Sequence, residues 1–164
     1  VESVEQFEEV AACVAGLGLT WIRGGAFKPR TNPHSFQGLG EEALKIMADA
    51  GQKYGLKTLT EVMDSAHCEM VHSYVDGLQV GARNFQNFSL LKNIGHVTRD
   101  SHKMVLFKRG FAGTISEWLS ACDYITMEGN DNVVLCERGI RTFETATRFT
   151  LDISAVPVVH KQSL

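Results

Sequence analysis

The 164-residue sequence lacks the features of several protein classes. No run approaches the ~20 apolar residues that a membrane span needs, and the N-terminus lacks the basic-then-apolar order of a signal peptide. The net charge is −3 and the pI is about 6.1. This balance argues against general affinity for nucleic acid, so a basic cluster here indicates a focused site. We expect a cytoplasmic protein without a nucleic-acid or membrane partner.

The sequence also lacks recognisable metal and thiol motifs. Its cysteines lie far apart and form no C-x-x-C pair: Cys13, Cys68, Cys122 and Cys136. This spacing suggests neither a zinc knuckle nor a redox dithiol. No H-E-x-x-H occurs, and His67 and His72, five residues apart, have the wrong spacing for a metal pair on one helix face. The chain therefore contains no complete metal site that the sequence reveals.

What is present is a regular alternation of short apolar strands and amphipathic helices. Helices are predicted from Ser3 to about Gly16, over 41–54, 65–74 and 114–129, and from about Phe143 onward, with another between the third and fourth strands. Strands are predicted at 19–23, 57–62, 76–82, 103–110 and 132–139. Capping boxes are expected at Ser3 with Gln6 and at Thr114 with Glu117.

Five such units without hairpin signals predict parallel strands covered by helices. A doubly wound sheet should carry a glycine-rich phosphate turn that leads directly into a helix, whereas "IRGGAF" leads into a loop that contains proline. We therefore expect an α/β fold of the (β/α)8 TIM-barrel type, incomplete because five of eight strands are visible. Residues 1–164 are expected to form a single partial catalytic domain, truncated at both ends.

The stretch "RGGAFKPRTNPHSFQGLG", residues 23–40, carries the clearest functional signal. Pro29 and Pro33 exclude helix over most of it, and the paired glycines suit a backbone that closely approaches a ligand. Arg23, Lys28 and Arg30 add three cations to a chain with a negative net charge. The loop is predicted to bind an anion. The simpler alternative is that Arg30 pairs with an acidic neighbour such as Glu41 or Glu42.

Charged residues also stand at the end of every predicted strand. They are Arg23, Glu61, Arg83, Lys108 with Arg109, and Glu137 with Arg138. In a barrel all of these fall at the C-terminal rim, where active sites of this fold are assembled. Such residues can instead form ion pairs that hold the rim together. The excess of cations favours a bound phosphate or carboxylate, which matches the fork of an arginine.

Longer motifs carry a family resemblance. "RGGAFKPRTNPHSFQGLGEE", "TEVMD", "LQVGARNFQNFSLL", "KRG", "CERGIRTFETATR" and "LDISAVPV" resemble the 3-deoxy-D-arabino-heptulosonate 7-phosphate (DAHP) synthases, in the short type I form related to the 3-deoxy-8-phosphooctulonate synthases. The similarity runs through nearly the whole chain. It implies a cytoplasmic, metal-dependent, aldol-type transferase, 3-deoxy-7-phosphoheptulonate synthase, that opens the shikimate pathway of aromatic amino acid biosynthesis and is a homo-oligomer when complete.

The reaction that this resemblance implies condenses phosphoenolpyruvate with erythrose 4-phosphate and releases phosphate by C–O cleavage. The residues that the resemblance places at the phosphoenolpyruvate are Arg23, Lys28, Gly81, Ala82, Arg83, Lys108 and Arg138. It places Glu61 near the reacting centre and makes Lys28 also a residue that handles a proton there. Pro29, Arg30 and Thr31 match the family's "K-P-R-T" contact with the aldose phosphate.

The chain departs from the family at the divalent metal, which is of the Mn, Fe, Zn or Co type. Family members hold it with a cysteine just after the first barrel strand, a histidine on the seventh strand, and a glutamate and an aspartate beyond. Val1-Glu2-Ser3 resembles the tail of "G-P-C-S-V-E-S", so that cysteine is expected just before the chain and the other ligands after it. We expect the 164 residues alone to be inactive.

Two alternatives stay open. The octulosonate enzymes use arabinose 5-phosphate and typically read "K-A-N-R-S" where this chain has Lys28-Pro29-Arg30-Thr31. The chain could also be a non-catalytic anion-binding fragment without the metal site.

Overall fold

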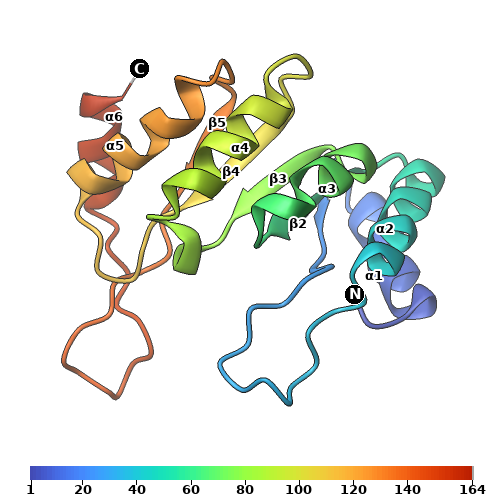
Figure 1. Cartoon of the computed structure of the whole chain (residues 1–164). Coiled ribbons are helices and arrows are strands. Elements are labelled where there is room, and N and C mark those ends of the chain that lie inside the picture. The colour runs from blue at the N-terminus through green and yellow to red at the C-terminus, as the bar shows by residue number, and fades with distance from the viewer. Residues whose placement is uncertain (164) are drawn as a thin grey trace. The chain divides into compact units, whose positions relative to one another are not determined.

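A computed structural model describes residues 1–163 and shows the alternation of strands and helices (Figure 1). The strands are β1 (Trp21–Arg23), β2 (Lys57–Val62), β3 (Gly77–Val80), β4 (Met104–Lys108) and β5 (Val133–Cys136). The helices are α1 (Val4–Gly16), α2 (Glu41–Tyr54), α3 (Cys68–Tyr74), α4 (Phe88–Thr98), α5 (Ile115–Thr126) and α6 (Ala155–Gln162). Short 3-10 helices occupy Ser65–His67 and Ala82–Asn84.

The five strands belong to one sheet in the order β1-β2-β3-β4-β5. Pairing is parallel between β1 and β2, with Arg23 opposite Leu59, and between β4 and β5, with Lys108 opposite Cys136. A doubly wound sheet reverses its strand order at a switch point, whereas barrel strands follow the chain. The sequential order confirms the prediction of an α/β fold with five strands of an incomplete (β/α)8 barrel.

Contacts group the chain into two compact units, residues 1–79 and the residues from Val80 on. In the first unit α2 packs between α1 and α3. Its core face carries Leu44 and Met47, both fully buried, at the spacing of one helical turn. The helix ends where predicted because Gly55 adopts a left-handed conformation with φ of 65°.

The predicted cap of α1 forms only in part. The Ser3 side chain accepts a hydrogen bond from the backbone N–H of Gln6 at 3.2 Å. The Gln6 side chain, however, accepts from the N–H of Glu2 at 3.1 Å and not from that of Ser3. One half of the capping box is therefore made, and the other half has moved one residue outward.

In the second unit α4 packs closely against α5. The approach is close because Gly95 has no side chain: a Cβ atom there would lie 2.5 Å from the carbonyl oxygen of Ile125. The capping box of α5 is complete, as predicted, since Thr114 Oγ1 accepts from the N–H of Glu117 and the Glu117 carboxylate accepts from the N–H of Thr114. Trp118 and Ile125 then bury the inner face of α5.

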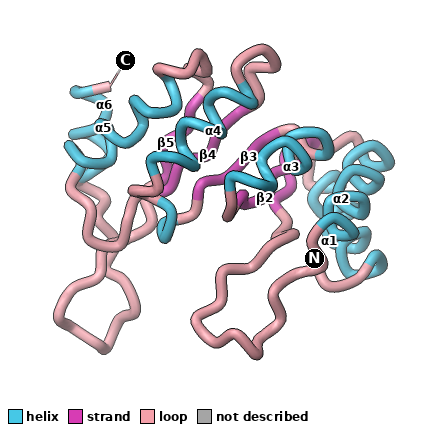
Figure 2. The backbone as a smooth tube through the Cα atoms, viewed as in Figure 1, coloured by secondary structure: helices cyan, strands magenta, loops and turns pink. Residues whose placement is uncertain are grey.

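The prediction of a helix from Phe143 is wrong. Residues 143–154 form a loop, drawn in pink in Figure 2, and α6 begins only at Ala155. An isolated antiparallel bridge between Ile140 and Thr150 closes the loop, and this closure is incompatible with a continuing helix. The four threonines between 142 and 150 are also poor helix formers. Phe143 is 99% exposed in consequence.

Among residues 1–163 no helix is long and apolar enough to cross a membrane.

The glycine of the "KRG" motif leads to a stability prediction. A Cβ atom on Gly110 would lie 2.6 Å from the ring of Phe85, which is itself buried and stacked on Phe107. We expect Gly110→Ala to cost about 1–3 kcal/mol because the packed ring must shift. Thermal melting of the complete protein measures the loss. Gly16→Ala is the matched control, since its Cβ atom would meet nothing within 4 Å. Equal melting temperatures for Gly110→Ala and the unmodified protein would contradict this packing.

Candidate anion-binding site

The predicted site residues fall into two groups, one in each compact unit. Arg23, the segment 28–31 and Glu61 lie in the first unit. The segment 81–83, Lys108 and Arg138 lie in the second.

In the first unit, one amide links the charged ends of the first two strands. Arg23 Nε donates to Gln79 Oε1 at 2.8 Å, and Gln79 Nε2 donates to Glu61 Oε2 at 3.1 Å. Gln79 is 1% exposed and Glu61 is 7% exposed, whereas Arg23 is exposed. The buried carboxylate is thus hydrogen-bonded, as buried polar groups must be, and the guanidinium keeps its other donors for a ligand.

Sequence reasoning missed Gln79. It lies on β3, at a position enclosed by apolar residues in "GLQV", and that lone polar side chain in a buried strand was the available signal. Its role follows from the order β1-β2-β3, because the carboxyl ends of adjacent parallel strands lie side by side. Its amide orients Arg23 and Glu61 together.

Two backbone hydrogen bonds close the loop over residues 24–40 at its base. Lys28 N–H donates to Gln37 O at 2.8 Å, and Gly40 N–H donates to Ala26 O at 3.0 Å. The backbone passes so closely there that a Cβ atom on Gly38, whose φ is 100°, would lie 2.1 Å from the oxygen of Ala26. Only glycine fits this position. Beyond these two hydrogen bonds, the intervening segment forms a long projecting loop (Figure 2).

Within this loop, Lys28 and Arg30 differ in their surroundings. Lys28 is half-buried and its Nζ lies 3.7 Å from Glu2 Oε1. Arg30 is exposed, as is Thr31, and within residues 1–163 it makes no ion pair. The alternative partner Glu41 is already engaged by Lys45 at 3.2 Å and by the hydroxyl of Tyr74 at 2.8 Å. The pairing of Arg30 with Glu41 is therefore not supported.

In the second unit, one of the strand-end cations has a structural role. Arg109 is 6% exposed, its Nε donates to Gly113 O at 2.9 Å, and its Nη1 donates to Asp152 Oδ2 at 2.8 Å. Glu137 Oε1 lies 3.8 Å from the same Nη1. This residue matches the ion-pair alternative, because carboxylates from two other segments neutralise it.

The partner Asp152 leads to a pH prediction. The hydroxyl of Ser154 donates to its carboxylate at 2.6 Å, and this bond, followed by the bond from Arg109, lowers the pKa of Asp152. A lowered folded-state pKa contributes stability above the unfolded pKa, and that contribution is lost as pH falls through the folded value. We expect Asp152→Asn to lower the melting temperature at pH 7, with a difference that narrows below about pH 4.

Melting curves of the complete protein between pH 7 and pH 3 make this comparison. Asp100→Asn serves as control because Asp100 is 90% exposed and pairs with its sequence neighbour Arg99 at the surface. If the melting temperatures of Asp152→Asn and the unmodified protein differed by the same amount at every pH, the lowered pKa of Asp152 would be contradicted.

Arg83 and Arg138 both lie near aromatic rings. The guanidinium of Arg83 lies 5.7 Å from the ring centre of Phe111, and that of Arg138 lies 4.7 Å from the same ring. Arg138 also lies 3.7 Å from the ring centre of Phe149. The structure thus brings these two predicted residues to one aromatic ring. In the described part of the chain neither of them forms an ion pair.

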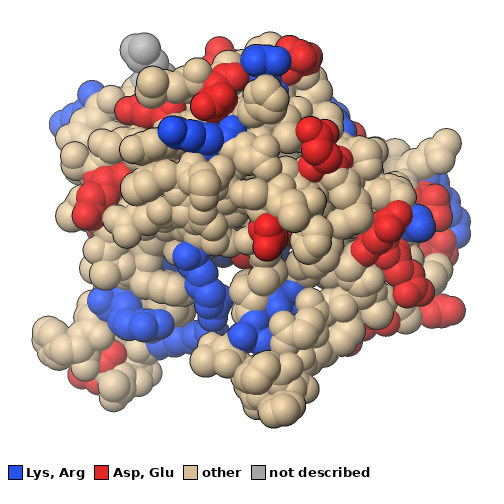
Figure 3. All heavy atoms as spheres, viewed as in Figure 1, with Lys and Arg blue, Asp and Glu red and all other residues tan. Residues whose placement is uncertain are grey.

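Arg138 shows the electrostatic signature of an anion site. Its Nε and Nη1 atoms are buried and, within residues 1–163, have no hydrogen-bond partner. Burial lowers the pKa of Arg138 from its ordinary value and the charge of Arg148 lowers it further, whereas the carboxylate of Glu137 opposes this shift and Arg83 and Arg141 add to it. Buried N–H donors normally have a hydrogen-bond partner. Two such donors without one, next to other arginines, indicate a site for an anion. Figure 3 shows Lys and Arg gathered at the base of the loop drawn in orange in Figure 1.

A groove of about 480 Å³ adjoins this cluster. Ala82 and Arg83 line one side, and the backbone from Gly110 to Gly113 lines another. Gly81, the third member of that predicted segment, is buried and precedes the 3-10 helix. Lys108 stands half-buried at the end of β4 and, among residues 1–163, makes no ion pair.

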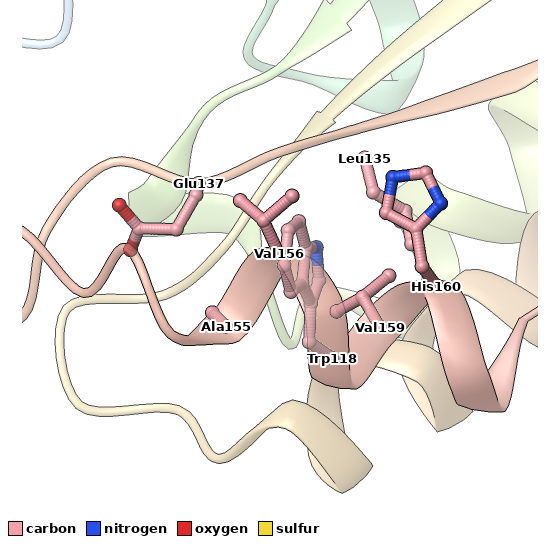
Figure 4. Close-up of a pocket in the computed structure, with 7 residues that line it drawn as sticks. All are labelled: Trp118, Leu135, Glu137, Ala155, Val156, Val159 and His160. Carbon is pink, nitrogen blue, oxygen red and sulfur yellow. The ribbon is translucent and has the colours of Figure 1, made fainter.

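A second pocket of about 100 Å³ has a different character (Figure 4). Trp118, Leu135 and three residues of α6 give it an apolar lining, with Glu137 and His160 at its sides. The indole N–H of Trp118 is buried there without a partner. With a carboxylate and no lysine or arginine in its lining, this pocket does not suit a phosphate.

The residues at hand do not fit a metal ion. Over residues 1–163 no group of three or more His, Cys, Asp or Glu side chains is arranged to hold one.

Comparison with known proteins gives the same family from sequence and from structure. Residues 1–164 match the DAHP synthetase I family. The chain is 50% identical over 163 residues to the phospho-2-dehydro-3-deoxyheptonate aldolase of Thermotoga maritima, which covers 99% of the chain and 47% of that protein. It is 31% identical over 143 residues to the 2-dehydro-3-deoxyphosphooctonate aldolase of Thiobacillus denitrificans, covering 85% of the chain and 49% of that protein.

Solved structures agree. The crystal structure of the Thermotoga maritima aldolase (DAHP synthase) matches with a TM-score of 0.91 and 49% identity, over 98% of this chain and 45% of that one. A truncated form of 3-deoxy-D-arabino-heptulosonate 7-phosphate synthase from the same organism matches with a TM-score of 0.86 and 47% identity, over 98% of this chain and 57% of that one. The chain spans about half the length of the curated relatives it matches.

Proposed function

The chain belongs to the DAHP synthetase I family, and we propose on this premise that the complete protein condenses phosphoenolpyruvate with erythrose 4-phosphate. The products are 3-deoxy-D-arabino-heptulosonate 7-phosphate and inorganic phosphate, at the first step of the shikimate pathway. The observation that carries the proposal is the 50% identity to a heptonate aldolase over 99% of the chain. Residues 1–164 form part of the single catalytic domain. A cytoplasmic location and a homo-oligomeric state stay predictions.

The second unit supplies phosphoenolpyruvate binding in this proposal. Arg83 and Arg138 share the ring of Phe111 and have no carboxylate partner in the described chain, so their charge is available to the substrate's phosphate and carboxylate. Lys108 adds an ammonium at the end of β4, and the backbone of Gly81 and Ala82 adds N–H donors. Each is a charge-assisted contact with a polyanion, the strong class of hydrogen bond.

The first unit supplies groups for the bond-forming step. Arg23 binds the same substrate, and the buried carboxylate of Glu61, held by Gln79, stabilises positive charge that develops on the former enol carbon. Lys28 donates a proton to the aldehyde oxygen as the carbon–carbon bond forms. Water then adds at the former enol carbon, and phosphate leaves by C–O cleavage.

The exposed part of the loop over residues 24–40 binds the second substrate. Pro29, Arg30 and Thr31 bind the aldose phosphate, Arg30 through its guanidinium and Thr31 through its hydroxyl. Because Arg30 has no ion pair in the described chain, its donors are available.

The octulosonate reaction is the alternative. The Thiobacillus denitrificans relative named for it is 31% identical to this chain, against 50% for the heptonate enzyme. The segment Lys28-Pro29-Arg30-Thr31 also favours the heptulosonate reaction.

The proposal is tested by incubating the complete protein, loaded in turn with Mn, Fe, Zn and Co ions, with phosphoenolpyruvate and erythrose 4-phosphate. We expect one phosphate released per seven-carbon sugar acid phosphate formed, identified by its mass. Absence of that product under every metal would overturn the proposal and favour a non-catalytic anion-binding protein.

A further inference from the structure

The guanidinium of Arg138 lies against a pair of stacked aromatic rings. It is 3.7 Å from the ring centre of Phe149 and 4.7 Å from that of Phe111. The two rings are themselves nearly parallel, with centres 5.5 Å apart and planes inclined by 9°. A planar cation is attracted to the negative face of an aromatic ring, and such contacts strengthen where water is excluded.

This way of holding an arginine differs from the way Arg109 is held. Arg109 is fixed by the carboxylate of Asp152 and by a backbone oxygen. Arg138 has no such bond to its Nε or Nη1 within the described chain. The carboxylate next to it in sequence, Glu137, is turned to the N–H of Gly139, which donates to both of its oxygens at 2.8 Å.

The difference has a chemical consequence. A carboxylate that fixed Arg138 would neutralise its charge and occupy its donors, which lie in the plane of the guanidinium. A cation–π contact attracts the same group without neutralising its charge and leaves the in-plane donors available. An arginine that must bind a substrate anion gains from being held in this second way.

We infer that Phe111 and Phe149 are positioning residues for Arg138, which hold its guanidinium through cation–π contacts so that its N–H groups meet an anionic substrate. The inference rests on the proposed function, in which Arg138 binds phosphoenolpyruvate. It assigns a role to two apolar residues that carry no chemistry of their own.

The backbone fixes both rings. Phe111 O accepts a hydrogen bond from the N–H of Arg141 at 2.8 Å, which joins the "KRG" segment to the loop after β5. Phe149 precedes Thr150, the residue bridged to Ile140. A Cβ atom on Gly139, whose φ is 81°, would lie 3.1 Å from Phe149 Cβ, so the loop is tight at this point. The rings are therefore placed before substrate arrives.

The test compares Phe149→Leu, which keeps apolar volume but removes the ring, with Phe149→Tyr, which keeps the ring face. Phe143→Leu is the matched control, because Phe143 lies in the same loop and is 99% exposed. In the complete protein we expect Phe149→Leu to raise the KM for phosphoenolpyruvate about tenfold, from the strength of a partly buried cation–π contact. The KM for erythrose 4-phosphate should stay unchanged, and both Phe149→Tyr and Phe143→Leu should behave like the unmodified protein.

A double-mutant cycle separates positioning from simple packing. If Phe149 acts through Arg138, adding Phe149→Leu to Arg138→Ala leaves the KM for phosphoenolpyruvate where Arg138→Ala alone sets it. Additive effects, equal changes for both substrates, or failure of Phe149→Tyr to preserve the affinity would overturn the inference. If Phe149→Leu melts below the assay temperature, Phe111→Leu carries the same comparison.

Calorimetric titration with inorganic phosphate distinguishes this inference from the proposed function. A protein that binds phosphate, loses about tenfold of that affinity in Phe149→Leu and makes no seven-carbon product retains the positioning role and refutes the reaction. A protein that makes the product but keeps full phosphate affinity in Phe149→Leu retains the reaction and refutes the positioning role.

Discussion

Replacing Arg138 by alanine is expected to weaken phosphoenolpyruvate binding by the complete protein by about one to two decades. The loss corresponds to about 1.5–3 kcal/mol, the range for a hydrogen bond to a charged group in a partly desolvated site. Arg138 has this effect because two of its donors are buried without a partner in the described chain, so the substrate anion is the group that satisfies them. Binding of the aldose phosphate should change far less.

Titration calorimetry measures this affinity directly. Arg99→Ala is the matched control, since Arg99 is an arginine of the same unit that pairs with Asp100 at the surface. Arg138→Lys tells charge from geometry, because lysine keeps the charge and loses the fork. Unchanged affinity in Arg138→Ala would remove this residue from the site.

The second large effect is expected at the loop tip. Arg30→Ala should raise the KM for the aldose phosphate at least about tenfold, or about 1.4 kcal/mol, and leave that for phosphoenolpyruvate nearly unchanged. The reason is the position of each residue along the loop. Arg23 and Lys28 lie nearest the end of β1, whereas the segment after Pro29 lies beyond the two hydrogen bonds that close the loop and is exposed.

Steady-state kinetics with each substrate varied in turn give the comparison. Lys45→Ala is a suitable control, because Lys45 is an exposed cation that pairs with Glu41 on α2. Equal effects of Arg30→Ala on both substrates, or no effect on the aldose, would show that Arg30 is not its ligand.

Much of the fold could be predicted because its signals are local. The strand 57–62 and the helix 41–54 have the predicted bounds, since apolar periodicity and Gly55 mark them within one stretch of sequence. The prediction of a helix from Phe143 was wrong because the contacts that hold this segment as a loop are not local. The bridge between Ile140 and Thr150 and the contact of Phe149 with Phe111 depend on segments brought together by folding.

The same distinction applies to the candidate site. Arg109 and Arg138 both follow strands, and nothing in their local sequence tells a structural arginine from a ligand-binding one. The difference arises because the carboxylate of Asp152, 43 residues along the chain, binds Arg109, whereas Arg138 lies against the rings of Phe111 and Phe149. Gln79 was missed for the same reason, since its partners Arg23 and Glu61 lie on other strands.

The most direct test of the central claim is a competition in one vessel. The complete, metal-loaded protein is given phosphoenolpyruvate with equal concentrations of erythrose 4-phosphate and arabinose 5-phosphate, and the two sugar acid phosphates are separated by mass. Their ratio reports the ratio of kcat/KM for the two aldoses. The account predicts that the seven-carbon product dominates. An excess of the eight-carbon product, or neither product, would contradict it.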